Sequence, residues 1–306
     1  MIESMILWLL AILTAPFFSA VILRIKAFFG GRKGSPLLIN YYTLIKLMKK
    51  GSVYSTSTTF LFKLGPMISL GAALTALMFL PVAGQKPLLS FNGDVIFILY
   101  LFGLGRFFTI AAAMDTASPF EGMGAAREAY FPIICEATLF MILILFYLLT
   151  GKLQLAAYFT NGQPQTLWQA AGSPLLFIVM AFFIILLTEN SRVPVDDPAT
   201  HLELTMIHEV MVLDHSGPDF GLIELGSFCK LFFYASIVAT LITPFDLGLP
   251  ALNVGLYLIA LLIVYIAVGV TESVMARYRM DLVPKFVLTS FALAFFATLI
   301  SLEFIQ

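Results

Sequence analysis

Long runs of mainly apolar residues recur along the 306-residue chain and are separated by shorter polar segments. A transmembrane helix needs about 20 such residues, so this pattern predicts a bundle of membrane-spanning helices. We expect the first run to be a retained span, because Glu3 precedes it and its basic residues follow it. The predicted spans are approximately residues 5–23, 60–82, 93–113, 130–149, 173–188, 226–245, 250–271 and 284–303.

The composition narrows the class of protein. Hydrophobic residues make up 60% of the chain and charged residues only 11%, whereas soluble domains carry about 25% charged residues. These values exclude an ordinary soluble enzyme, a nucleic-acid-binding protein and a disordered chain. We therefore predict an all-α, polytopic membrane protein with about eight transmembrane helices, forming one integral membrane domain over residues 1–306.

The distribution of Lys and Arg predicts the orientation in the membrane. Fifteen of the 17 basic residues lie in or beside the segments that follow the first, third, fifth and seventh spans, and only Lys86 and Lys152 lie on the other side. Cytoplasmic segments carry an excess of Lys and Arg, so we expect a cell (inner) membrane protein with both termini outside. The predicted cytoplasmic segments are about residues 24–59, 114–129, 189–225 and 272–283.

The first two cytoplasmic segments differ in character. Residues 36–50 place apolar side chains at helical spacing with lysines on the other side, which predicts an amphipathic helix near the inner membrane face. This helix is either a surface helix held by anionic lipid or a docking surface. Residues 114–129 contain Pro119, Gly122 and Gly124, which favour a solvated loop.

The third cytoplasmic segment, residues 189–224, is rich in acids and contains all three histidines. Bulky apolar residues alternate with the acids, so we expect helices that fold back against the bundle and partly bury several carboxylates. Partial burial raises the pKa of a carboxyl group and suits it to carrying protons. His201, His208 and His215 recur every seven residues, and we interpret them as hydrogen-bonded or proton-relay imidazoles, with a metal site as the alternative.

Two charges lie well inside the predicted spans. Arg106 and Glu136 each lie six or seven residues from the inner end of their span, roughly 10 Å deep at the rise of an α-helix. Charges at this depth usually pair, so we expect an Arg106–Glu136 ion pair, either in an ion pathway or only fixing helix register. The outer halves of several spans carry no charge. This pattern suits half of a pathway, entered from the cytoplasm and leaving sideways into a neighbouring subunit.

The two cysteines, Cys135 and Cys229, both lie in apolar stretches. An iron–sulfur cluster usually requires four thiolates, and a zinc site requires several Cys or His ligands. We therefore expect no cofactor or metal in this chain, and any electron carriers on other subunits.

Several motifs resemble one family of membrane subunits. They are Gly-Gly-Arg-Lys-Gly-Ser-Pro at residues 30–36 and Glu-Asn-Ser-Arg-Val-Pro-Val-Asp at residues 189–196. With eight spans, these motifs resemble the membrane heel subunit (subunit 1) of respiratory complex I and its relatives in energy-converting group 4 hydrogenases. The stretches beginning at Asp115 (D-T-A-S-P-F), Gly124 (G-A-A-R-E) and Glu272 (E-S-V-M-A-R-Y-R) are similar to the formate hydrogenlyase and hydrogenase-4 membrane subunits.

This resemblance implies a membrane subunit that docks the hydrogenase large and small subunits, which hold the [NiFe] centre and the iron–sulfur clusters. It also implies that the subunit couples their chemistry to proton or sodium movement through antiporter-like membrane subunits. The candidate pathway residues are Glu136, Glu189, Asp196, Glu203, Glu209, Asp115, Glu128 and Glu272, with Arg106, Arg127, Arg192 and Lys230 as their charge partners.

The sequence also departs from the complex I pattern. Ser35 precedes Pro36 and Leu37 follows it where complex I subunits carry R-x-G-P-N, and Val195 replaces a Phe. These differences disfavour a quinone site, and a quinone-linked subunit of complex I type is the alternative function. A purely structural anchor and a free-standing transporter are further alternatives. The intramembrane Glu136 counts against the first, and the lack of an internal repeat counts against the second.

Overall fold

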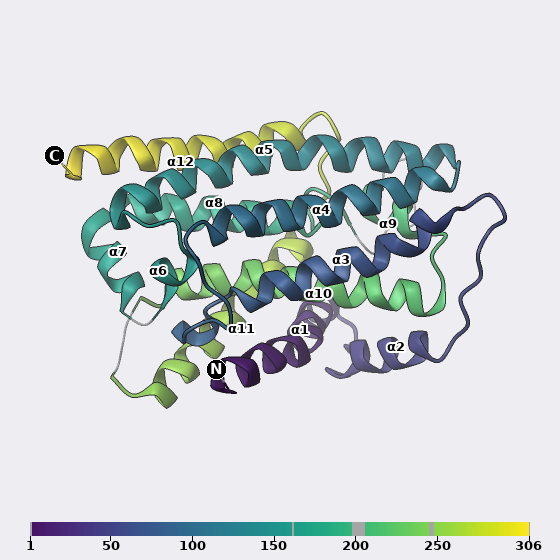
Figure 1. Cartoon of the computed structure of the whole chain (residues 1–306), viewed down its shortest axis with the longest axis horizontal. Coiled ribbons are helices and arrows are strands. Elements are labelled where there is room, and N and C mark those ends of the chain that lie inside the picture. Colours follow the sequence, from purple (N-terminus) through teal and green to yellow (C-terminus); the bar gives the residue numbers. More distant parts are fainter. Residues whose placement is uncertain (1, 161, 198–205, 245–247, 306) are drawn as a thin grey trace.

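The computed structural model describes residues 2–160, 162–197, 206–244 and 248–305. The described chain is helical and forms one elongated bundle (Figure 1). Its elements are α1 (Ile2–Phe29), α2 (Ile39–Met48), α3 (Phe60–Met78), the 3₁₀ turn η1 (Val82–Gly84), α4 (Asp94–Asp115), α5 (Pro119–Thr150), α6 (Leu155–Phe159), α7 (Gln163–Ala171), α8 (Pro174–Glu189), α9 (His208–Val212), α10 (Gly217–Ile242), α11 (Pro250–Val274) and α12 (Val283–Ile305).

Seven of the described helices are long and apolar enough to cross a membrane, namely α1, α3, α4, α5, α10, α11 and α12. The remaining predicted span corresponds to α8. It meets the same measure only together with α7, from which it is bent by 119°. These findings confirm the predicted all-α, polytopic membrane fold.

The two ends of the bundle differ. We call one the polar end, because it holds the described parts of the connections 30–59, 190–216 and 275–282, including α2 and α9. The opposite end holds α6 and α7, which connect α5 to α8 (Figure 1). We call it the α6–α7 end. The long helices run between the polar end and the α6–α7 end.

The interior between the helices is apolar and aromatic. Phe18 stacks on Tyr265 with ring centroids 5.3 Å apart, and Phe102 stacks on Tyr234 at 5.6 Å. Cys229 is a fully buried free thiol in this interior. Helices in a membrane associate mainly through close packing, so these interlocking rings fix how α1, α4, α10 and α11 lie against one another.

The segment 114–129 is not the solvated loop that the sequence predicts. Instead, α5 begins at Pro119 and continues through Gly122 and Gly124 without interruption. Proline is well suited to the first turn of a helix, where its missing N–H has no partner to lose. Gly124 is required by packing, because a Cβ there would lie 2.3 Å from a Val210 methyl group of α9.

The connection before α10 is also shorter than predicted. The sequence places the start of this span near residue 226, whereas α10 begins at Gly217. Asp219 and Glu224, which the sequence assigns to a cytoplasmic segment, therefore lie on the first turns of a long helix. Charged residues lowered the hydropathy of these turns without preventing helix formation, because the neighbouring elements bury Asp219 and partly cover Glu224.

The predicted amphipathic helix of residues 36–50 is confirmed as α2. It packs beside α1 and α10, where Asn40 donates a hydrogen bond to the carbonyl of Pro16 (2.9 Å) and Tyr41 donates one to the carbonyl of Leu13. Figure 1 shows α2 alongside the polar end of α10. Its outward face carries exposed apolar side chains at Tyr42 and Ile45.

Candidate functional site

Three helices bring their charges together around Arg106, in the polar half of the bundle. The guanidinium of Arg106 on α4 contacts Glu136 of α5 at 2.8 Å and Glu189 at the end of α8 at 2.9 Å. Lys230 of α10 contacts the same Glu189 carboxylate at 2.9 Å. The predicted Arg106–Glu136 contact is therefore present, and it is part of a larger network.

The burial of this network is uneven. The side chain of Glu189 is 1% exposed and that of Arg106 is 11% exposed, whereas that of Glu136 is 41% exposed. A buried carboxylate requires compensating charge, which Arg106 and Lys230 supply together. Glu136 lies at the periphery of the bundle, so the network extends from the interior to a lateral surface.

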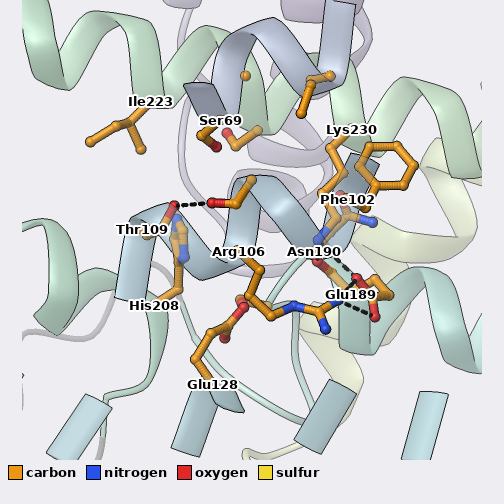
Figure 2. Close-up of a pocket in the computed structure, with 16 residues that line it drawn as sticks. Ser69, Phe102, Arg106, Thr109, Glu128, Glu189, Asn190, His208, Ile223 and Lys230 are labelled. Carbon is orange, nitrogen blue, oxygen red and sulfur yellow. Dashed lines mark hydrogen bonds and ion pairs between the residues drawn. The ribbon is translucent and has the colours of Figure 1, made fainter. Parts of the chain in front are cut away.

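A cavity of about 80 Å³ adjoins the Arg106 network. Its lining includes Glu128 and Asn190 as well as Arg106, Glu189 and Lys230. Figure 2 shows Arg106 extending between Glu128 on α5 and Glu189 on α8. Such a volume is large enough for several water molecules, and polar groups line it. The arrangement can therefore exchange protons between carboxylates through water.

A second charged network surrounds Glu272 near the end of α11. Its side chain is fully buried and lies 3.3 Å from Arg192 and 3.0 Å from Lys26 of α1. Lys26 also lies 3.8 Å from Asp197. Two cations again compensate one buried carboxylate, as they do at Glu189.

Asp196 ties α9 to the connection that follows α11. One of its carboxylate oxygens accepts hydrogen bonds from the backbone N–H groups of Ile207 (3.1 Å) and His208 (3.0 Å). The other oxygen lies 2.9 Å from Arg277. Hydrogen bonds to a charged acceptor are the stronger kind, so this carboxylate holds the start of α9 in place.

A cavity of about 200 Å³ lies within the second network. Its ionisable lining residues are Lys26, Arg192, Asp196, His208, Glu209, Glu224 and Glu272. The two cavities share a wall, because both are lined by Asn190, Ser191, His208, Ile223 and Ser227. The two charged networks therefore lie side by side, and this shared wall separates them.

His208 is the titratable side chain of the shared wall. Burial lowers the pKa of its imidazole, and the nearby Glu209 carboxylate acts in the opposite direction. The imidazole is therefore neutral at neutral pH and can both donate and accept a hydrogen bond. A neutral imidazole between two charged cavities is suited to relaying protons.

The structure does not bring every predicted site residue into these cavities. Asp115 accepts hydrogen bonds from the backbone N–H and the hydroxyl of Thr59, and so holds the start of α3 outside both cavities. Arg127 donates to the carbonyl of Met206 at 2.8 Å and fixes the segment before α9. Glu203 lies outside the described residues.

Of the two histidines that the structure describes, only one lines the cavities. His208 lines both cavities, whereas the His215 ring stacks on Phe62 with centroids 3.9 Å apart. His201 lies outside the described residues. In the part of the chain that the structure describes, no group of three His, Cys, Asp or Glu side chains is arranged to hold a metal ion.

Sequence reasoning missed several members of the two networks. Lys26 contributes to the predicted orientation but not to the predicted site, and Asn190 and Glu224 are absent from the predicted set. The signal for Lys26 and Glu224 was available, because each lies close to the polar end of a predicted span. The contact of Lys26 with Glu272 of α11 and the place of Glu224 in the cavity lining were not available, because they depend on which helices become neighbours.

The bundle is apolar beyond the Arg106 network. A cavity of about 50 Å³ toward the α6–α7 end is lined by aliphatic and aromatic side chains, including Phe102, Phe146 and Phe182. Its side-chain polar atoms come only from the hydroxyl groups of Tyr158 and Tyr234. The residues that line this cavity include no carboxylate or cation, and the buried Asp94 lies nearer the α6–α7 end, at the start of α4.

Comparisons with known proteins identify the family that the motifs of residues 30–36 and 189–196 resemble. The chain is 28% identical over 289 residues to formate hydrogenlyase subunit 4 of Escherichia coli, covering 92% of each chain. It is 28% identical over 291 residues to hydrogenase-4 component C of the same organism, covering 92% of this chain and 90% of that protein. It is 27% identical over 243 residues to NADH-ubiquinone oxidoreductase chain 1 of Arabidopsis thaliana, covering 76% of this chain and 71% of that protein.

A solved structure has the same fold. One chain of the membrane-bound sulfane sulfur reductase, an archaeal respiratory membrane complex, superposes with a TM-score of 0.82 over 98% of both chains at 19% identity. The family described as NADH dehydrogenase matches residues 2–302 of this sequence. The chain therefore belongs to the NADH dehydrogenase family of membrane subunits, which includes NADH-ubiquinone oxidoreductase chain 1 and the membrane subunits of formate hydrogenlyase and hydrogenase-4.

Proposed function

We propose that this chain is the membrane-anchoring and ion-coupling subunit of an energy-converting group 4 [NiFe] hydrogenase or formate hydrogenlyase-type complex. Its polar end docks the hydrogenase large and small subunits, which carry the [NiFe] centre and iron–sulfur clusters. Its lateral surface meets antiporter-like membrane subunits. The match to formate hydrogenlyase subunit 4 and hydrogenase-4 component C over 92% of the chain supports this assignment.

The observation that carries the proposal is the connection between the two charged networks. A charge or proton that enters at Glu272 reaches the shared wall at His208 and then the Arg106 network. Arg106 contacts both Glu189 and Glu136, so a shift of its guanidinium changes the electrostatic environment of both carboxylates at once. This gives a physical means of passing an electrostatic change from the polar end to Glu136.

Glu136 is the exit in this proposal. The cavity beyond Phe102 is lined by no carboxylate or cation, whereas the Glu136 side chain reaches the lateral surface of α5. A half-exposed carboxylate inside a membrane span is costly unless a partner covers it. We therefore place the neighbouring membrane subunit against this face.

The test is the variant Glu136→Gln in the purified complex, reconstituted into vesicles. Gln keeps the shape of the side chain but cannot carry a proton or a full charge. We expect hydrogen-dependent dye reduction to continue while redox-driven ion uptake falls by about tenfold or more, as for loss of an essential proton carrier. The control is Glu303→Gln, which removes an exposed carboxylate near the C-terminal end of α12. Uptake that survives Glu136→Gln would contradict the pathway.

A quinone-linked subunit of complex I type is the second candidate, supported by the match to NADH-ubiquinone oxidoreductase chain 1. Mild purification of the tagged chain separates the two candidates. Co-purified hydrogenase subunits, nickel and hydrogen-dependent viologen reduction support the hydrogenase complex. A nickel-free complex that reduces quinone supports the alternative and directs attention to Ser35 and Pro36.

A further inference from the structure

The only two lysines on the side of the predicted topology that is poor in basic residues lie in one groove. Lys86, in the connection between α3 and α4, and Lys152, just after α5, both line a groove of about 760 Å³ at the α6–α7 end. Both side chains are exposed, and neither forms an ion pair with a described residue. None of the described residues lining the groove is acidic. Among the residues that the structure describes, no acid compensates the two positive charges of this groove.

The two walls that carry these lysines are fastened to each other. Gly93 N–H donates to the carbonyl of Leu153 at 2.7 Å, and the Gln154 amide donates to the Ser90 hydroxyl at 2.5 Å. The walls therefore hold the lysine-bearing segments in a fixed relation, which reduces the entropy that a ligand would have to remove on binding.

The nearest buried acid does not neutralise the groove. Asp94 at the start of α4 is fully buried, and its carboxylate accepts a hydrogen bond from the backbone N–H of Leu155 at 2.8 Å. It also accepts a long hydrogen bond from the hydroxyl of Ser90 (3.5 Å) but does not itself line the groove. Asp94 forms no ion pair with either lysine, so both ammonium groups can contact an external anion.

The polar rim of the groove favours a ligand that donates hydrogen bonds. The hydroxyls of Thr160 and Thr166 line the groove, and each donates to a backbone carbonyl of its own helix or turn. Their oxygens keep lone pairs that can accept hydrogen bonds from a ligand, whereas the Thr150 oxygen already accepts one from the backbone N–H of Lys152. An anion that also carries hydroxyl groups fits this combination of lysines and acceptors.

An apolar surface leads away from the groove along the membrane-spanning helices. Leu149 lines the groove, and Leu148, Tyr147 and Ile144 of α5 are 42%, 48% and 50% exposed. On the adjacent α4, Tyr100 is 70% exposed. A ligand with hydrocarbon chains would bury this surface while its charged group stays between the lysines.

We propose that this groove binds an anionic phospholipid with a hydroxylated headgroup, of the phosphatidylglycerol class. The phosphate lies between Lys86 and Lys152, the headgroup hydroxyls donate to the threonine oxygens, and the acyl chains lie along α4 and α5. The bound lipid fills the space between the α3–α4 connection, the end of α5 and the α6–α7 pair, and holds them together.

The test is photolabelling of the purified complex in nanodiscs with a phosphatidylglycerol that carries a diazirine in its headgroup, followed by peptide mapping. We expect the label on residues 86–91 and 149–166. The double variant Lys86→Gln with Lys152→Gln should reduce the labelling of these residues by about 30-fold. Lys86→Arg with Lys152→Arg keeps the charges and should retain the label. Lys33→Gln with Lys285→Gln removes two exposed lysines at the polar end and should leave the groove label unchanged.

Three results would overturn the proposal. The first is equal labelling by the matching phosphatidylcholine probe, which carries no net negative charge. The second is full competition by inorganic phosphate at millimolar concentration, which would make the site one for a small free anion. The third is an amine-reactive cross-link from Lys86 or Lys152 to an acidic segment of another subunit that blocks the lipid label.

Discussion

At the scale of single residues, buried carboxylates determine the character of the site. Glu189 and Glu272 are each compensated by two cations that come from different parts of the chain. The sequence indicates that Arg106 needs a partner inside the membrane, and Glu136 at matching depth is the correct one. It does not indicate that Glu189 is a second partner, because depth along a span can be counted whereas lateral neighbours cannot.

His215 gives a prediction about pH at this scale. Burial lowers the pKa of its imidazole from 6.5 to about 4, although Asp219 and Asp214 nearby act in the opposite direction. Upon acidification the unfolded chain therefore binds a proton before the folded chain does. The contribution of His215 to stability is complete above pH 6.5 and is lost as the pH falls toward 4, by about 3 kcal/mol at most.

The measurement is the thermal midpoint of the purified complex between pH 7.5 and pH 4.5, for the wild type and for His215→Phe. Phenylalanine keeps a ring stacked on Phe62 but cannot be protonated. We expect the midpoint of the variant to fall less steeply with acidification than that of the wild type. Parallel curves would show that His215 is not the residue that senses the proton.

At the scale of elements, α5 shows how packing can override a local sequence signal. Pro119, Gly122 and Gly124 together suggest a loop, yet the helix runs from Pro119 to Thr150. Proline is acceptable because it begins the helix, and Gly124 is needed because α9 lies directly against it. Gly122 has open space beside it. The two glycines therefore have different roles that the sequence alone does not distinguish.

This difference predicts opposite effects of the same substitution. In Gly124→Ala the new methyl group would meet Val210 at 2.3 Å and the carbonyl of Ile207 at 2.9 Å, so we expect destabilisation of about 1–3 kcal/mol. Gly122→Ala meets no atom within 4 Å and should be neutral or stabilise the helix by about 0.5–1 kcal/mol. Thermal midpoints and limited proteolysis near residues 206–216 measure both effects. Equal behaviour of the two variants would contradict the close packing of α9 on α5.

At the scale of the whole molecule, the bundle has a charged end and an end poor in charge. The networks around Glu189 and Glu272 lie toward the first, and the apolar cavity beside Phe102 and Phe146 lies toward the second. In the proposed pathway, an ion that enters at the polar end would meet the two charged networks and then the apolar cavity. This asymmetry is the physical reason to expect a lateral exit toward a partner subunit.

The same asymmetry predicts the orientation in the membrane. Because 15 of 17 basic residues belong to the polar end, we expect a cysteine introduced by Ser57→Cys to face the cytoplasm and one introduced by Gln163→Cys to face outward. A membrane-impermeant maleimide applied to intact cells should label only the second. The background is low because Cys135 and Cys229 are fully buried. Labelling of Ser57→Cys in intact cells would reverse the orientation.

The sequence by itself determined the fold class, the approximate spans, the amphipathic α2 and the residue types of the site. Apolar length and charge asymmetry are properties of consecutive residues, and the membrane acts on them directly. The tertiary structure alone decided that Lys26 reaches Glu272, that Asp115 serves the start of α3, and that α5 is continuous. These outcomes depend on which helices become neighbours. Only the folded bundle sets those contacts, because they join residues far apart in the chain.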